Sequence, residues 1–219
     1  MLGIHLGTAR VGLGLSVRIW NRGYSELVSK TQSKTRFSLA NLKIGRAVDV
    51  AHHPNADTMY VSQIDVTAPG GAATVRQVCS GLRAYVGADA LEGSLVVVVD
   101  NLKKCKLRGE VSEAMLLCGE DTVQGIVVPC RPALGAVDAA SLVGKQVILA
   151  GSAGEVAAET RRLKRAEWEE LASRLSVDAD HRVVFWDPEA GKTVPLCVLD
   201  GEREVGIVVD SVGPGSAVC

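Results

Sequence analysis

Residues 101–117 read NLKKCKLRGEVSEAMLL, and this stretch does most to decide the fold. It lies between two apolar runs, Leu95–Val99 and Ala114–Cys118. Short apolar runs rich in valine are typical of β-strands, so the sequence predicts two strands joined by a loop that ends at Gly109. The loop carries four cations and no acid among them: Lys103, Lys104, Lys106 and Arg108. A basic loop on a small β scaffold is suited to binding the phosphates of a nucleic acid.

The charge of the whole chain limits where such binding can occur. The 219 residues include 24 Lys and Arg and 25 Asp and Glu, which gives a net charge of −1. A generic nucleic-acid-binding protein is more basic than this. Residues 1–36 carry six basic residues and one acid, whereas residues 143–219 carry nine and thirteen. Any cationic surface must therefore be local: the N-terminal segment, the 103–108 loop or Arg161–Arg165.

Composition excludes several classes of protein. Hydrophobic residues make up 47% of the chain, which is typical of a globular protein, and no apolar run approaches the roughly 20 residues of a membrane helix. Six scattered cysteines without metal-ligand spacing indicate reduced thiols in a cytosolic protein, although Cys219 leaves an intermolecular disulfide open. The sequence has no phosphate-binding loop, nucleophile elbow or persuasive pair of carboxylates. We therefore expect no catalytic residue, no metal and no cofactor.

The N-terminal segment, residues 1–36, is expected to be a separate, flexible extension. It is rich in Gly, Ser and Thr as well as basic residues, and Ser29–Lys34 resembles a linker. A flexible basic arm would add affinity for nucleic acid. An organelle transit peptide is also arginine-rich and poor in acids, so an organellar location is the alternative.

Residues 37–150 have the pattern of a small β domain. Short runs rich in Val and Ile are separated by turn residues, and Val86–Leu91 could form a single helical turn before the fourth run. The predicted strands are Ile44–Ala51, Tyr60–Val66, Thr74–Ser80, Ser94–Asp100, Ala114–Cys118, Ile126–Pro129 and Gly144–Leu149. This arrangement predicts a mainly β fold, a closed barrel of the OB type.

Residues 151–219 are expected to form a small α+β domain. Gly151–Thr160 is small and polar, which suits a connection, and Arg161–Leu175 has the apolar spacing of an amphipathic helix. Three strands are predicted after it: Val183–Trp186, Val194–Leu199 and Glu204–Val209.

Three segments together resemble the signature of the tRNA-binding domain family. They are His53–Val61 (HPNADTMYV), Cys79–Leu82 (CSGL) and Asn101–Leu117, in the family's order and spacing. The resemblance covers roughly residues 38–149 and implies an OB fold that binds tRNA without strong sequence preference. Lys104 departs from the family pattern, which usually has proline there, and so adds a charge to the loop.

The last third resembles the extra domain of endothelial monocyte-activating polypeptide II and its relatives, the C-terminal parts of a synthetase-complex cofactor and of some tyrosyl-tRNA synthetases. Leu163–Leu175 followed by Val183–Trp186 carries this likeness, with Trp168 after a basic helix start. It implies a domain that imitates a dimer interface, and hence a monomeric protein. Only part of the family's cytokine-linked heptapeptide is present at residues 43–49, which makes a secreted cytokine-like factor a distant alternative.

Most of the residues expected to bind tRNA lie in the third motif, and the others lie in or near the second. The four loop cations would contact phosphates, Arg108 in a bidentate manner. Asn101 and Ser112 could bond sugar or base edges, with turn-stabilising roles equally open. Glu113 would be repelled by phosphate, so it must face a base donor or hold a neighbouring cation. The rest of the expected set is Ser80, Arg83, Arg76 and Met115, with Arg161, Arg162, Lys164 and Arg165 as secondary contacts.

The sequence thus predicts a cytoplasmic, non-catalytic accessory protein. It would capture tRNA and deliver it to an aminoacyl-tRNA synthetase or a multisynthetase complex. The main alternative is a scaffold of such a complex with little tRNA binding, which the acidic balance outside the loop favours. His53, in front of Pro54, is expected to be a turn residue and not a catalytic base.

Overall fold

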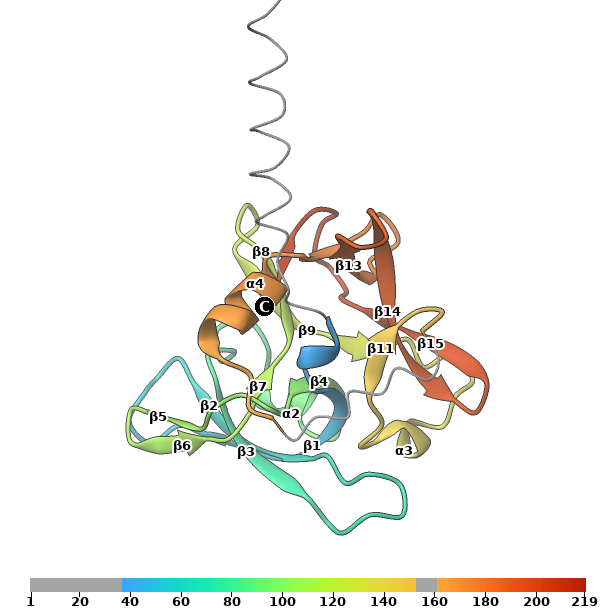
Figure 1. The fold of residues 1–219 in the computed structure, drawn as a ribbon. Coiled ribbons are helices and arrows are strands. Elements are labelled where there is room, and N and C mark those ends of the chain that lie inside the picture. The colour runs from blue at the N-terminus through green and yellow to red at the C-terminus, as the bar shows by residue number, and fades with distance from the viewer. Residues whose placement is uncertain (1–36, 153–160) are drawn as a thin grey trace, which may run out of the picture. The chain divides into compact units, whose positions relative to one another are not determined.

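A five-stranded antiparallel sheet begins the fold of the computed structural model, which describes residues 37–152 and 161–219. After the short 3-10 helix η1 (Phe37–Leu39), the strand order is β3–β2–β1–β4–β7 (Figure 1). The strands are β1 (Leu42–His52), β2 (Tyr60–Asp65), β3 (Val75–Ser80), β4 (Leu95–Val99) and β7 (Met115–Leu116). The predictions for residues 1–36 and for most of the connection 151–160 lie outside the described residues.

The sequence of strand β4, LVVVV, contains no polar residue. All five of its residues are buried, because the strand is covered on both faces. Val96 and Val98 pack into one apolar cluster with Ile64 and Leu116. Leu95, Val97 and Val99 face a second, larger cluster. The strand is therefore the wall between two cores.

The segment between helix α3 (Ala139–Leu142) and strand β11 (Val147–Leu149) packs against β1 of the first sheet. The Ile44 amide donates to the Lys145 carbonyl at 2.9 Å, and the Gly144 amide donates to the Ile44 carbonyl at 2.8 Å. Gly144 has φ +74°, and a Cβ there would lie 2.1 Å from the Thr67 carbonyl oxygen. A nearly closed, barrel-like arrangement follows, with helix α2 (Ala88–Leu91) between β3 and β4 as predicted.

The second sheet joins the C-terminal third to the barrel. Its main order is β10–β15–β14–β13–β12–β16–β8–β9, with β11 pairing with β14. Three strands come before residue 140: β8 (Cys118–Asp121), β9 (Ile126–Pro129) and β10 (Arg131–Pro132). Five come after residue 170: β12 (Leu175–Val177), β13 (Val183–Asp187), β14 (Lys192–Asp200), β15 (Arg203–Val208) and β16 (Ala217–Val218). The described parts of the two expected domains therefore share a sheet and a core.

The predicted helix over Arg161–Leu175 was too long. Helix α4 spans only Arg165–Ala172. Leu163 is held in an extended bridge with Leu102, and Lys164, with φ −77° and ψ 152°, is the extended residue before the helix. The amphipathic spacing was correct for the core face, since Trp168 and Leu171 are buried. Tertiary pairing of Leu163 therefore shortened the helix at its start.

Two other strand predictions need correction. The run Ala114–Cys118 is not one strand, because the chain changes sheets at Leu117, between β7 and β8. The basic loop contains two short strands of its own, β5 (Cys105–Leu107) and β6 (Glu110–Ser112). Across the described residues, every helix is too short or too polar to span a lipid bilayer.

Candidate nucleic-acid interface

The basic segment folds into a β-hairpin, which we call the basic hairpin (residues 103–112). Strands β5 and β6 pair antiparallel from Cys105–Ser112 to Leu107–Glu110. The two turn residues, Arg108 and Gly109, have φ of +50° and +107°. Tight two-residue hairpin turns favour positive φ, which glycine adopts freely and arginine does not. The turn therefore places the Arg108 side chain at the hairpin tip.

The hairpin tip is braced by the first signature segment. The buried His53 ring bonds through Nε2 to the Leu107 carbonyl at 2.9 Å, and its Nδ1 accepts from the Asn55 amide at 3.1 Å. Asn55 Nδ2 donates to the Arg108 carbonyl at 3.1 Å. Because Nδ1 accepts, Nε2 carries the proton and donates. The HPNAD segment thus acts as a turn, as predicted, and also holds the tip of the basic hairpin.

The hairpin base is tied to β3 by Gln77, a residue that the sequence did not single out. Its Nε2 donates to the Val111 carbonyl at 2.9 Å. Its backbone exchanges two bonds with Glu113: the Gln77 amide donates to Glu113 Oε2 at 3.1 Å, and the Glu113 amide donates to the Gln77 carbonyl at 2.8 Å. Hydrogen bonds therefore hold the basic hairpin at both its tip and its base.

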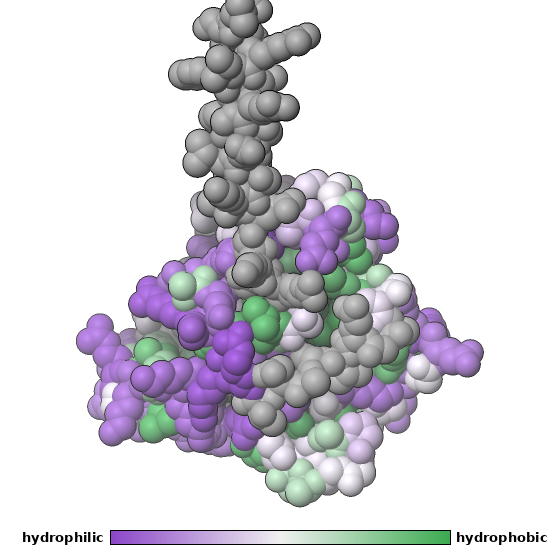
Figure 2. Space-filling model, viewed as in Figure 1, coloured by the Kyte–Doolittle hydropathy of each residue, from purple (hydrophilic) through white to green (hydrophobic). Residues whose placement is uncertain are grey.

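Three of the four hairpin cations are exposed and unneutralised. Lys103, Lys106 and Arg108 are solvent-exposed, and none forms an ion pair with another described residue. Hydrophilic side chains gather at the lower left of the face in Figure 2, where Figure 1 places β5 and β6. Three like charges on one short hairpin repel each other, so a phosphate backbone is a favourable partner for them.

The fourth hairpin cation differs, because Lys104 pairs with Glu113. Of the two roles left open for Glu113, the structure shows it holding a neighbouring cation. Hydrogen bonds from Lys104 and from the Gln77 amide lower the pKa of the Glu113 carboxyl, so it is ionised at neutral pH. Lys104 therefore brings no uncompensated charge to the hairpin.

Asn101 and Ser112 do not face solvent, which favours the structural one of the two roles left open for them. Both are buried. Ser112 Oγ accepts from the Cys79 amide at 3.0 Å and donates to the Ala114 carbonyl at 2.9 Å. Asn101 Oδ1 accepts from the Asn41 amide at 2.9 Å, and its Nδ2 donates to the carbonyls of Leu39 and Arg161. Their polar atoms are used inside the protein, so they position backbone.

Arg76 is likewise committed to an internal partner. Its Nε donates to Asp100 Oδ1 at 2.6 Å, and Lys43 Nζ donates to Asp100 Oδ2 at 2.8 Å. We call these three residues the Asp100 cluster. Burial by itself raises the pKa of Asp100, but hydrogen bonds from Arg76 and Lys43 outweigh it and lower the pKa. Arg76 therefore neutralises a buried acid and adds little to a positive face.

The other expected contacts, Arg83, Ser80 and Met115, differ in exposure. Arg83 is partly exposed, and its nearest carboxylate, Asp57, is 4.0 Å away. Ser80 Oγ is buried without a hydrogen-bond partner among the described residues. Met115 is half-buried and packs against the larger core cluster, so its role as a base contact has less support than Arg83's.

The secondary cations fall into two kinds. Arg161 pairs with Glu167 at 3.2 Å, and Arg165 pairs with Glu169 at 2.7 Å. Arg162 Nη1 donates to the Leu102 carbonyl at 3.1 Å, directly before Lys103. Lys164 is exposed, and its backbone amide donates to Glu167 Oε2 at 2.9 Å. Glu167 thus caps the helix start that these cations would otherwise disfavour.

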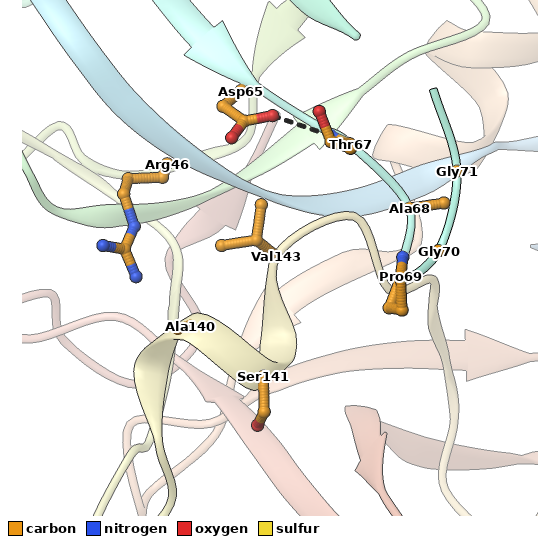
Figure 3. Close-up of a pocket in the computed structure, with 10 residues that line it drawn as sticks. All are labelled: Arg46, Asp65, Thr67, Ala68, Pro69, Gly70, Gly71, Ala140, Ser141 and Val143. Atoms are coloured by element: carbon orange, nitrogen blue, oxygen red, sulfur yellow. Dashed lines mark hydrogen bonds between the residues drawn. The ribbon is translucent and has the colours of Figure 1, made fainter. Parts of the chain in front are cut away.

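A pocket of about 420 Å³ lies elsewhere, between the β2–β3 turn and α3 (Figure 3). Arg46 and Asp65 line it from β1 and β2, and Val143 lines it from the segment after α3 (Figure 3). Arg46 Nε is buried without a partner among the described residues, and Asp65 Oδ1 accepts from the Thr67 amide at 2.9 Å. Because a cation and a carboxylate both line it, the pocket offers no excess positive charge to a phosphate backbone. Within the described residues, no group of three or more His, Cys, Asp and Glu side chains could hold a metal ion.

Comparison with known proteins agrees with this geometry. Residues 42–136 match the family model described as a putative tRNA binding domain. The aminoacyl tRNA synthase complex-interacting multifunctional protein 1 of Cricetulus griseus is 34% identical over 143 residues, which cover 65% of this chain and 36% of that protein. The cytoplasmic tyrosine–tRNA ligase of Xenopus laevis is 38% identical over 143 residues, or 64% of this chain and 24% of the ligase. The chain thus spans well under half the length of either relative.

A solved structure gives the same fold over most of the chain. The C-terminal domain of Plasmodium vivax p43 superposes with a TM-score of 0.64 and 24% identity, covering 84% of this chain and 99% of that domain. The mainly β, barrel-containing fold predicted from sequence is confirmed, and so is the resemblance drawn from the three motifs. Residues 42–136 are thus similar to the family of putative tRNA-binding domains.

Proposed function

We propose that this protein is a non-catalytic tRNA-binding accessory protein that delivers tRNA to an aminoacyl-tRNA synthetase or a multisynthetase complex. The observation that carries the proposal is the basic hairpin: three exposed, unneutralised cations on a braced platform, inside a segment that matches a putative tRNA-binding domain. Lys103, Lys106 and Arg108 are the primary phosphate contacts. Arg83 and Ser80 flank them, and Arg161–Arg165 supplies secondary contacts.

Binding of this kind depends on the backbone and shape of the RNA. Lysine and arginine contacts to phosphates release counterions and carry no direct sequence information. Folded RNA is recognised largely through such contacts. A protein that also binds a synthetase raises the effective concentration of tRNA at that enzyme without any new catalytic group.

The partners and the cellular location are inferred from similar proteins. Two similar proteins are named for a synthetase complex and for a cytoplasmic tyrosine–tRNA ligase, and this chain matches only part of each. We infer a cytoplasmic protein whose partners are tRNA and a synthetase. Residues 37–150 would bind tRNA, and residues 151–219 would imitate a dimer interface and keep the protein monomeric. Residues 1–36 would act as a basic extension.

Filter binding with total tRNA tests the proposal. Wild-type protein is expected to bind with an affinity that falls steeply as salt rises. The variant Lys103→Ala/Lys104→Ala/Lys106→Ala/Arg108→Ala should lose on the order of 100-fold in affinity near 0.15 M salt and show a flatter salt dependence, as the loss of three phosphate contacts predicts. A matched control is Lys192→Ala, an exposed lysine at the start of β14.

One observation favours the scaffold alternative. Several cations outside the hairpin are already paired with acids, including Arg76, Arg161 and Arg165. A scaffold would bind a synthetase while wild-type protein and the four-residue variant bound total tRNA equally weakly. That outcome would replace tRNA capture by protein interaction as the function.

A further inference from the structure

The chain brings its second cationic segment, residues 161–165, directly against the start of the basic hairpin. Leu102 and Leu163 form a parallel bridge, although 60 residues separate them in sequence. The Leu163 amide donates to the Asn101 carbonyl at 2.9 Å. Leu163 is buried in the larger core cluster, and Leu102 packs against it. The two cationic segments therefore lie side by side over an apolar anchor.

Asn101 is the polar centre of this contact. Its side-chain amide bonds three backbone groups in two separate segments, residues 39–41 and Arg161. Oδ1 accepts from the Asn41 amide at 2.9 Å, and Nδ2 donates to the Leu39 carbonyl at 2.8 Å and to the Arg161 carbonyl at 3.0 Å. Both protons of Nδ2 are used, so no other side chain of similar size reproduces the set. Asn101 is 7% exposed, too little for a direct RNA contact.

The four cations in residues 161–165 differ in whether an acid already pairs with them. Arg162 is exposed, and its guanidinium reaches the Leu102 carbonyl at 3.1 Å, next to Lys103. Lys164 is exposed on the same extended segment. Arg161 and Arg165 differ, because Glu167 and Glu169 pair with them.

We infer that Asn101 is a positioning residue that holds residues 161–165 against the basic hairpin, so that Arg162 and Lys164 continue its row of cations into one composite phosphate-binding track. The inference rests on the proposed function, because the track is meant for the RNA backbone. Of the four cations in residues 161–165, only Arg162 and Lys164 would then contact RNA. Asn101 would affect RNA affinity indirectly, through these two residues. Arg162 and Lys164 then depend on Asn101 for their contribution.

A double-mutant comparison tests this dependence, with total tRNA as the probe and the full chain as the protein. In the wild-type background, Arg162→Ala should weaken binding about fivefold near 0.15 M salt and lower the slope of log affinity against log salt by 0.7–0.9, the change for about one phosphate contact. Asn101→Asp keeps the acceptor for the Asn41 amide but removes both Nδ2 donors. In the Asn101→Asp background, Arg162→Ala should change neither the affinity nor the slope.

Controls separate positioning from loss of stability. Arg76→Ala weakens a different internal contact and leaves Asn101 intact, so Arg162→Ala should still cost about fivefold in that background. Amide hydrogen exchange at Leu163 should accelerate in Asn101→Asp and stay slow in Arg76→Ala. If Arg162→Ala weakens binding equally with and without the Asn101→Asp change, the positioning role is wrong.

A second experiment needs no change at Asn101 and decides the matter if Asn101→Asp does not fold. Arg162→Ala/Lys164→Ala should make the dependence of log affinity on log salt less steep by the amount expected for about two phosphate contacts. Lys192→Ala should leave that dependence unchanged. An unchanged slope in the double variant would overturn the composite track. If that happens while the four-residue hairpin variant still loses binding, the proposed function stands and only this inference fails. If wild-type protein does not bind tRNA, the proposed function fails first.

Discussion

The basic hairpin and the Asp100 cluster use the same kinds of residue in opposite ways. In the cluster, Arg76 and Lys43 surround a carboxylate whose side chain is only 4% exposed. In the hairpin, Lys103, Lys106 and Arg108 are exposed and pair with no described acid. Cations in the first group neutralise a buried acid, and under the proposed function those in the second bind phosphates. The presence of a nearby acid, and not the number of positive charges, separates a structural site from a binding site.

The first prediction, with the largest expected effect on the free energy of unfolding, removes the Arg76 side chain from the Asp100 cluster. Arg76→Ala leaves a buried carboxylate with Lys43 as its remaining partner. Breaking a fully buried ion pair costs about 3–5 kcal/mol, and the partial exposure of Arg76 reduces this to about 2 kcal/mol. Urea unfolding should show that loss in the free energy of unfolding, while tRNA affinity changes less than about threefold, since no phosphate contact is lost. A large drop in affinity with unchanged stability would place Arg76 in the interface instead.

Acid should weaken the Asp100 cluster. The folded-state pKa of Asp100 is lowered, so its contribution to stability is present above the unfolded value of about 3.9 and is lost as the pH falls through the folded value. Asp100→Asn removes the titrating group. The difference in free energy of unfolding between wild type and Asp100→Asn should be clear at pH 7 and shrink toward pH 3. Equal differences at both pH values would show that the Asp100 charge does not contribute.

Much of this fold could be predicted from local patterns, and the failures have a common cause. The valine-rich run at residues 95–99 and the HPNAD turn are decided by their own residues, and both were predicted. The start of α4 was not, because Leu163 is held by Leu102 from a distant part of the chain. Gln77 was missed for the same reason: it sits in an ordinary strand, and its partners Val111 and Glu113 are more than 30 residues away. One sequence carries no signal for such pairs.

In the candidate site too, local residues could be predicted from the sequence and contacts between distant residues could not. The sequence identified the four hairpin cations and stated the two possible roles of Glu113. It could not tell which lysine of the basic run has an acid partner, although Lys104 departs from the family pattern. The structure shows that it is Lys104, which pairs with Glu113. Burial of Asn101 and Ser112 was equally invisible, since polar residues next to a basic loop are usually exposed.

The smallest effect we predict tests whether that pairing persists when RNA binds. Lys104→Ala alone is a poor test, because it removes a cation and also leaves the Glu113 carboxylate unpaired beside the phosphates. Lys104→Ala/Glu113→Gln removes both charges, keeps the net charge constant and retains an oxygen that can accept from the Gln77 amide.

This double variant should bind total tRNA with wild-type affinity and salt slope. Lys106→Ala should lose about fivefold in affinity near 0.15 M salt and lower the slope by 0.7–0.9. Two positions apart in the sequence, the lysines would then differ only because one has an acid partner. If the double variant lowers the slope as much as Lys106→Ala, Lys104 must leave Glu113 to bind a phosphate. Pairing in the free protein would then not predict which cations contact RNA, and Arg161 and Arg165 would return as candidates.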